Sequence, residues 1–178
     1  MCSNGGAQRG HTVLKSDGTR HVFHHFGSGT LNGADTYLPE DFILNPLVFR
    51  EEWEELKNLG WEPYVYFDGK CIITNPLDMM ANQIIERSRG NNKHGSCGMG
   101  IYNTIQRYKK QIYTFTSSWS YYMNMFKSMG ITLSEQEEEL FNPFKNLGLQ
   151  DHYNEDLDFM MSHVHVVNDD QLLNGYDT

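Results

Sequence analysis

Two of the Asn-Pro pairs in this chain constrain its fold more than any other feature. Asn45-Pro46 and Asn75-Pro76 both favour the start of a helix, because asparagine is a good N-cap and proline fits the first helical position. Apolar residues follow each pair at helical spacing, so we expect helices that end at Gly60 and near Gly90. The expected buried positions are Phe49, Trp53, Leu56, Leu77, Met80, Ala81, Ile84 and Ile85. The glutamates expected to face solvent on the first helix are Glu51, Glu52, Glu54 and Glu55.

Strand-like runs alternate with these helices. The stretch HTVLKSDGTRHVFHHF (residues 11–26) predicts a β-hairpin, because two apolar or β-branched runs flank the turn residues Ser16, Asp17 and Gly18. We expect a glycine-rich loop at residues 27–36, and the runs YVYF and KCIIT predict two strands or one interrupted strand. A strand-then-helix order of this kind predicts an α/β fold.

Residues 111–178 have a more helical and aromatic pattern than residues 1–110. Ser134 and Glu137 have the spacing of a capping box, and a short β-like run, HVHVV, lies near the end of the chain. We therefore expect an α/β segment with two glycine-rich loops over residues 1–110, followed by a helical region and C-terminal tail over residues 111–178. One expected helical face in the second part carries Ile112, Phe115, Trp119, Tyr122, Phe126 and Met129.

Composition limits the classes of partner. The chain has 178 residues and is 39% hydrophobic, which is enough to bury a core. Its net charge of −9 argues against a surface for nucleic acid or anionic membrane. Cys2, Cys71 and Cys97 are widely spaced, which fits a reducing compartment better than a disulfide framework. Without a signal-peptide pattern or an apolar run of bilayer length, the sequence predicts a soluble, cytoplasmic protein.

Two glycine-rich stretches are the candidate ligand-binding loops. In NGGAQRGHTV (residues 4–13), three glycines surround His11, which can exchange a proton near neutral pH. In RGNNKHGSCGMGI (residues 89–101), backbone N–H groups and the Ser96 hydroxyl could wrap an anion. No lysine follows the second glycine of this loop, so it is not a Walker loop. Taken alone, the first stretch fits a terminal tail with a turn better than a ligand loop, and the second fits a surface loop equally well.

The histidines and Cys97 suggest two other kinds of chemistry. His21, His24 and His25 lie in one predicted strand, and His163 and His165 would share a face of another. No carboxylate or cysteine spacing completes a zinc site, so neutral histidines in solvent or at the edge of the core are the preferred interpretation. Cys97 as a nucleophile has no partnered base in the sequence.

The order of the segments resembles the middle of adenylosuccinate synthetase. GGAQRGHTV resembles the family's GGxNAGHT segment, and HVFHHFGSGTL resembles its LHxxPSG segment. ILNPLVFREEWEELKNLGW then resembles the V-x-x-P helix that closes in ELxxxG, and IIERSRGNNKHGSCGMGI resembles the ARG…IGTTGRGIG loop. These ordered matches cover residues 5–101, and the helical region to about residue 165 is consistent with their continuation. The resemblance implies a partial synthetase-like α/β fold, with an N-terminal hairpin and mixed region followed by helices.

The resemblance implies purine nucleotide chemistry. In the family, GTP phosphorylates the 6-oxygen of inosine monophosphate, the aspartate amine displaces that phosphate, and Mg²⁺ bridges the charged groups. A related phage enzyme does similar work on a guanine deoxynucleotide. The implied ligand of this chain is a purine nucleoside monophosphate. The family's dimer contacts lie partly in this segment, which implies a homo-oligomer or a complementary synthetase chain as the protein partner.

Individual residues carry the resemblance further. His11 resembles the family's catalytic histidine, which assists transfer of the γ-phosphoryl group. Gly10 resembles the residue whose carbonyl oxygen meets Mg²⁺, a cation that prefers oxygen ligands. The implied nucleotide-binding residues are Gln8, Ser28, Gly29, Gly95, Ser96, Cys97 and Gly98.

Several positions depart from the family pattern. Cys97 stands where the family has threonine and Met99 where it has arginine, and a second family arginine aligns near Gln111, with Lys109 and Lys110 close by. Each change weakens the case for tight phosphate binding. The sequence also has no counterpart of the family's GDEGKGK phosphate loop, or of the segments that bind the GTP base and aspartate. We therefore expect one part of a split enzyme, or a truncated relative with little activity alone. The alternative is a non-catalytic module that binds and sequesters a nucleotide or docks onto a synthetase.

Overall fold

The computed structural model describes residues 5–168, which form two compact units. Residues 5–73 and 156–168 make up the first unit, and residues 74–155 the second. Helix α6 (Leu147–Ser162) begins in the second unit and ends in the first. The sequence division expected after residue 110 falls inside the second unit, where α3 (Ile101–Lys109) ends. Among residues 5–168, no helix is both long enough and apolar enough to cross a membrane.

The first unit contains the strands, and the structure confirms the predicted hairpin. β1 (His11–Leu14) pairs antiparallel with β2 (Arg20–Phe23). The other strands form a parallel sheet in the order β3-β5-β7 and a parallel pair β4-β6. YVYF and KCIIT therefore form two strands in different sheets. The bounds are β3 Thr36–Leu38, β4 Ile43–Leu44, β5 Val65–Asp68, β6 Ile72–Ile73 and β7 His165–Val167.

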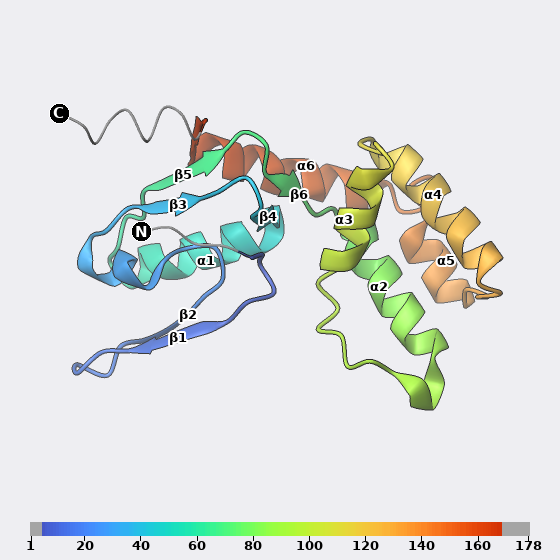
Figure 1. The fold of residues 1–178 in the computed structure, drawn as a ribbon, viewed down its shortest axis with the longest axis horizontal. Helices are drawn as coiled ribbons and strands as arrows, with labels where there is room; N and C mark the ends of the chain where they lie inside the picture. The colour runs from blue at the N-terminus through green and yellow to red at the C-terminus, as the bar shows by residue number, and fades with distance from the viewer. Residues whose placement is uncertain (1–4, 169–178) are drawn as a thin grey trace. The chain divides into compact units, whose positions relative to one another are not determined.

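Helix α1 (Pro46–Asn58) supplies one side of the core of this unit. Asn45 caps it, since its side chain accepts a hydrogen bond from the backbone N–H of Val48, and Pro46 is the first helical residue, as predicted. Phe49 and Leu56 are fully buried in the core of this unit. Figure 1 shows α1 beside the hairpin of β1 and β2. The residues that they join there include Phe23, Leu38, Val65, Phe67 and Met160.

The second unit is helical. The predicted capping box at Ser134 and Glu137 is present. Asn75 is the N-cap of α2, as predicted, and it forms a second capping box with Asp78. The expected aromatic face is correct within α4, but Ile112 lies before that helix and Met129 is its C-cap, which leaves the Met129 side chain 50% exposed. The remaining elements are α2 Pro76–Ser88, η2 Gly90–Asn92, α4 Phe115–Ser128 and α5 Glu135–Phe141. Their core contains Leu77, Ala81, Ile84, Phe115, Tyr122, Phe126 and Phe141.

A buried ion pair joins α2 to α3 in the second unit. The carboxylate of Asp78 accepts hydrogen bonds from Nε and Nη2 of Arg107, both at 2.8 Å. The Thr104 hydroxyl donates to Asp78 at 3.1 Å, and the Tyr122 hydroxyl donates at 2.5 Å. The Asp78 carboxylate is fully buried, and these hydrogen bonds and the charge of Arg107 stabilise its negative charge in the core. The network fixes the start of α3, where the second glycine-rich loop ends.

Candidate functional site

The first glycine-rich loop is tied to the body of the first unit. Gly5 has a φ of +102°, its carbonyl accepts from the N–H of Ile43 at 2.9 Å, and Ala7 donates back to the Ile43 carbonyl at 3.3 Å. Ala7 is fully buried. This stretch is therefore an ordered loop against β4, and the interpretation as a simple terminal tail does not describe residues 5–10.

Arg9 turns its guanidinium inward and binds the backbone that follows the hairpin. It donates to the carbonyls of His25 at 2.8 Å and Phe26 at 3.1 Å, and also to that of His24. The guanidinium lies 5.3 Å from the ring centre of Phe42. Burial lowers the pKa of Arg9, and the negative charge of Glu52 acts against this shift. Arg9 thus links the loop before His11 to the segment after the hairpin, a role that the sequence did not indicate.

Glu52 is the main correction to the sequence analysis in this unit. The helical pattern predicts that Glu52 faces solvent, but the residue is only 2% exposed. Its carboxylate can be buried because it accepts three backbone hydrogen bonds. The N–H groups of His24, His25 and Phe26 donate to it at 2.8, 2.6 and 3.3 Å. Burial raises the pKa of Glu52, but these bonds and the neighbouring imidazoles outweigh it and hold the pKa at about 2. A charged side chain of α1 therefore anchors the end of the hairpin.

The hairpin histidines surround this carboxylate. His25 is fully buried, and its Nε2 accepts from the backbone N–H of Asn45 at 3.1 Å, so the proton of the neutral ring is on Nδ1, 3.6 Å from Glu52. Burial lowers the pKa of His25 and keeps the ring neutral. His21 is also buried, with Nε2 3.7 Å from Glu52 and Nδ1 3.4 Å from Glu55. Nδ1 of His24 lies 2.5 Å from the carbonyl oxygen of Arg9 and 3.2 Å from that of Ala7. These histidines organise the end of the hairpin and the loop before it.

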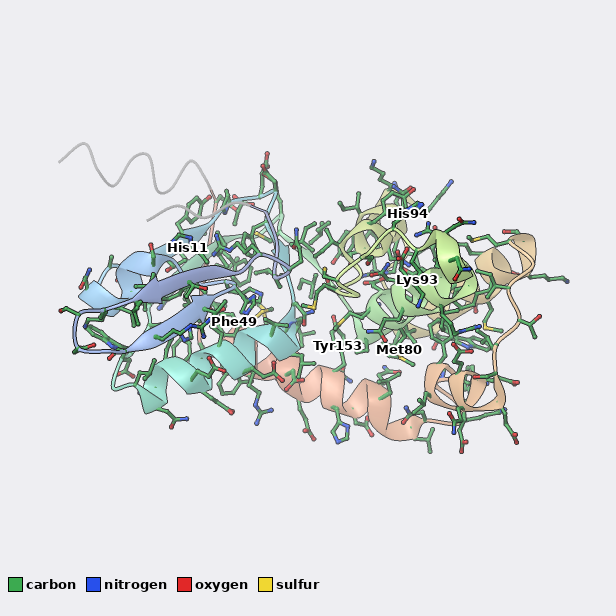
Figure 2. All side chains as sticks on the ribbon, turned by 90° about the horizontal axis from the view of Figure 1, so that it is seen from below. His11, Phe49, Met80, Lys93, His94 and Tyr153 are labelled. Atoms are coloured by element: carbon green, nitrogen blue, oxygen red, sulfur yellow. The ribbon has the colours of Figure 1, made fainter. Side chains whose placement is uncertain are left out.

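The residues matched to the family in this unit lie on the exposed side of these anchors. His11 is the first residue of β1, opposite Phe23, and its side chain is exposed (Figure 2). Gln8 and Gly10 are exposed as well. Ser28 and Gly29 are half-buried and begin the 3-10 helix η1 (Ser28–Asn32), which continues the loop expected after the hairpin. Gln8, Gly10 and His11 are thus accessible, and the backbone beside them is held by the His24 ring, which contacts the carbonyls of Ala7 and Arg9.

The second glycine-rich loop follows α2 and depends on left-handed backbone at Gly95, Gly98 and Gly100. At Gly100, where φ is +71°, a Cβ atom would lie 2.6 Å from the carbonyl carbon of Asp78 and from the nitrogen of Met79. Only glycine fits there, so the loop can pass closely over the start of α2 before α3 begins. The carbonyl of Gly100 accepts the first hydrogen bond of α3, from Thr104 at 2.8 Å.

Glu86 of α2 lies under this loop. One carboxylate oxygen accepts from the backbone N–H groups of His94, Gly95 and Ser96 at 3.0, 3.2 and 3.4 Å, and the other accepts from Arg89. Burial by itself would raise the pKa of Glu86. The hydrogen bonds from Arg89 and from these N–H groups have the larger, opposite effect, so the pKa of Glu86 lies below its ordinary value. The N–H groups expected to wrap an anion thus already bind a carboxylate of the same chain.

Ser96 and Cys97 lie on the outer side of the loop. The Ser96 hydroxyl donates to Asn82 Oδ1 at 2.7 Å and accepts from the N–H of Gly98 at 3.2 Å. Cys97 is a free, exposed thiol. Beside them is a cavity of about 270 Å³, bordered by Gln83, Glu86, Arg87, Lys93, Gly95, Ser96 and Gly98. Figure 2 shows Lys93 and His94 on this loop.

Two basic residues, Arg87 and Lys93, border the cavity, and they differ in whether the side chain already has an ion-pair partner. Arg87 forms an ion pair with Glu137, with Nε 2.5 Å from a carboxylate oxygen. Lys93 is exposed and has no ion pair within residues 5–168. Its ammonium is therefore available to an anion that enters the cavity.

A magnesium site is not complete in this part of the chain. Gly10 offers one carbonyl oxygen, but residues 5–168 hold no group of three or more His, Cys, Asp or Glu side chains that could bind a metal. A hard divalent cation needs several oxygen ligands, so these residues alone do not fit Mg²⁺. His163 and His165 do not share a strand face as predicted: His163 follows α6 and stacks on Phe159, whereas His165 lies in β7 and stacks on Tyr64.

Comparison with known proteins identifies the family. The family model described as adenylosuccinate synthetase matches residues 2–174. This chain belongs to the adenylosuccinate synthetase family. The adenylosuccinate synthetase of Borrelia duttonii is 31% identical over 98 residues, which is 55% of this chain and 23% of that protein. The enzyme of Acaryochloris marina is 32% identical over 99 residues, covering 54% of this chain and 22% of the relative. The chain thus spans about a quarter of the length of these curated relatives.

A solved structure supports the fold. The fully ligated adenylosuccinate synthetase from Plasmodium falciparum is similar with a TM-score of 0.54, covering 93% of this chain and 43% of that one. The sequence identity is 20%, so this likeness concerns the fold alone. The predicted mixed α/β, synthetase-like fold is confirmed.

Sequence reasoning missed the residues that hold the end of the hairpin and the two loops. Helical periodicity placed Glu52 among the exposed glutamates of α1, and Arg9 and Glu86 were not singled out at all. One signal was available for Lys93: it is the only cation inside the run GNNKHGSCGMG. No local pattern distinguishes Glu86 from its neighbours on α2, since its partners are backbone N–H groups 8 to 10 residues later.

Proposed function

We propose that this segment binds a purine nucleoside monophosphate, with the phosphate against the loop at Gly95, Ser96, Cys97 and Gly98. The observation that carries the proposal is the cavity beside the ordered Ser96 hydroxyl, where Lys93 provides a cation in a chain of net charge −9. A local positive group suits a phosphate, which overall negative charge would otherwise repel. The Ser96 hydroxyl can donate to that phosphate when it exchanges Asn82 Oδ1 for a phosphate oxygen. Family membership supports a purine nucleotide as the ligand class.

The resemblance assigns the other roles in this proposal. His11 is the proposed catalytic group that assists phosphoryl transfer, Gln8, Ser28 and Gly29 are proposed nucleotide contacts, and Gly10 is a proposed single oxygen ligand to Mg²⁺. The described residues do not complete a metal site, so no step is assigned to the metal here. In this proposal, GTP and aspartate are the other two substrates of the whole synthetase reaction, to which this segment contributes one part.

Calorimetric titration tests nucleotide binding. Inosine, adenosine and guanosine monophosphates are titrated separately into the full chain, and at least one should give saturable heat. Ser96→Ala and Lys93→Ala should each weaken that binding by about two- to tenfold, the range for one lost hydrogen bond. Lys127→Ala, an exposed cation on α4, is the matched control and should bind like the unchanged chain. Folded protein that gives no heat with any of the three overturns the proposal.

A complementation assay tests whether this binding serves catalysis. We propose that the segment works with a separate chain that carries GDEGKGK and the later family segments, or as a homo-oligomer with little turnover alone. A mixture with such a chain, GTP, aspartate and Mg²⁺ should form adenylosuccinate, and His11→Ala should lose turnover while keeping nucleotide affinity. Nucleotide binding without turnover in any mixture would instead indicate a non-catalytic binding module.

A further inference from the structure

Glu86 is the one side chain that holds three successive N–H groups of the glycine-rich loop. The groups belong to His94, Gly95 and Ser96, and all three converge on a single oxygen at 3.0 to 3.4 Å. Such convergence is the geometry of a backbone nest, which normally surrounds an anion. Here the anion is supplied from within the chain, 8 to 10 residues earlier.

The burial of the contact separates two roles that Glu86 could have. A carboxylate that occupies the ligand position would compete with phosphate and would lie on the exposed side of the loop. Glu86 is instead only 8% exposed and approaches from α2, whereas Gly95, Ser96 and Cys97 are exposed. The carboxylate thus fills the inner side of the loop, where it also borders the cavity, and Lys93, Gly95 and Ser96 line the more exposed part of it.

The groups on the outer side depend on this inner contact. The Ser96 N–H is bound to Glu86, and the Ser96 hydroxyl is held by Asn82 of the same helix and accepts from Gly98. A loop fixed at both the backbone and the side chain of Ser96 keeps its hydroxyl in one place. Arg89 binds the second oxygen of Glu86 and balances its charge, so the contact persists at neutral pH.

We propose that Glu86 is a positioning residue for the phosphate loop: its carboxylate takes the place of an inner anion and holds residues 94–96 ready for an incoming nucleotide phosphate. The inference rests on the proposed function, because it concerns the same loop. It predicts that the loop is ordered before any ligand binds. If the loop is ordered in only a fraction of the molecules, the apparent affinity for the nucleotide falls in proportion to that fraction. Glu86 would therefore strengthen binding by keeping the loop ordered.

Amide hydrogen exchange on the full chain without ligand tests the positioning role directly. Glu86→Ala should reduce the protection of the N–H groups of residues 94–96 by about tenfold or more, because each loses its acceptor. Glu86→Gln keeps one acceptor oxygen and should restore part of the protection. Glu139→Ala, an exposed glutamate of α5 in the same unit, is the control and should leave the loop unchanged. Circular dichroism should show that all three variants are folded.

Titration with inosine monophosphate then separates this inference from the proposed function. Glu86→Ala should bind about tenfold more weakly than the unchanged chain, and Glu86→Gln should lie between them. The inference is overturned if Glu86→Ala leaves the amide protection of residues 94–96 unchanged. It is also overturned if Glu86→Ala binds inosine monophosphate more tightly, which would indicate that the carboxylate competes with the phosphate. If the unchanged chain itself does not bind, the proposed function fails, while the exchange result still decides whether Glu86 orders the loop.

Discussion

Replacing Glu52 with glutamine should destabilise the first unit strongly. The carboxylate binds three N–H groups, those of His24 and Phe26 through one oxygen and that of His25 through the other. An amide offers one oxygen, so its NH₂ group must face at least one of these donors. The better orientation keeps His24 and Phe26 bonded and leaves the His25 N–H, now 2.6 Å from its acceptor, facing another donor.

The magnitude follows from the bonds that are lost. One buried N–H without an acceptor costs about 1 to 3 kcal/mol, and two bonds that lose the charge of their acceptor cost about 1 kcal/mol together or somewhat more. We therefore expect a loss of about 3 kcal/mol. For a chain of this length, that corresponds to a fall in melting temperature of about 6 to 12 °C.

Urea and thermal unfolding, followed by circular dichroism and tryptophan fluorescence, measure this loss. The matched control is Glu54→Gln on the same helix, where the carboxylate is exposed and pairs only with Arg50 at 3.1 Å. An exposed pair of this kind contributes about 0.5 kcal/mol or less. If Glu52→Gln and Glu54→Gln unfold within 0.5 kcal/mol of each other, the buried carboxylate does not anchor the hairpin and the reasoning is refuted.

Three further predictions concern pH and the second unit. The pKa of Glu52 is about 2 in the folded protein, against an ordinary 4.5. The ionised carboxylate therefore stabilises the fold fully above pH 4.5, and this stabilisation is lost as the pH falls toward 2. Glu52→Gln should flatten the pH dependence of the urea midpoint between these two pH values. Asp78→Asn should cost about 3 to 5 kcal/mol by urea unfolding, because it leaves the charge of Arg107 buried without its counter-ion, whereas exposed Asp151→Asn should change stability little. Gly100→Ala should cost more than Gly130→Ala, for which left-handed backbone alone predicts about 1 to 2 kcal/mol, because only at residue 100 does the new Cβ meet backbone, at 2.6 Å. Equal melting temperatures for the two alanine variants would contradict this explanation.

The fold follows closely from local sequence signals. Asn45-Pro46 and Asn75-Pro76 begin helices as predicted, and the turn at residues 16–18 joins two paired strands. These signals succeed because capping and turn formation depend on residues only a few positions apart. The apolar stripe of α4 is correct for the same reason, and it fails only at its ends, where Ile112 and Met129 lie outside the helix.

The site depends on contacts between distant residues, and here the sequence was less informative. Its glycine-rich loops could be located from composition and order, and the family resemblance is what proposes His11 and Ser96 as members of the site. What holds those loops could not be found in this way. Arg9 reaches carbonyls 15 to 17 residues away, and Glu52 binds N–H groups 26 to 28 residues away.

The sequence by itself determined the hairpin, the helix starts, the apolar faces and the family resemblance, since each is written in short-range patterns. Only the tertiary structure decided that two glutamates, on α1 and α2, serve as internal anions, Glu52 for the end of the hairpin and Glu86 for the second glycine-rich loop. The physical reason is that a carboxylate is stable inside a protein only where several donors converge on it. That convergence exists for Glu52 and Glu86 once the hairpin and the glycine-rich loop have folded back over their helices, and no residue next to either glutamate in the sequence announces it.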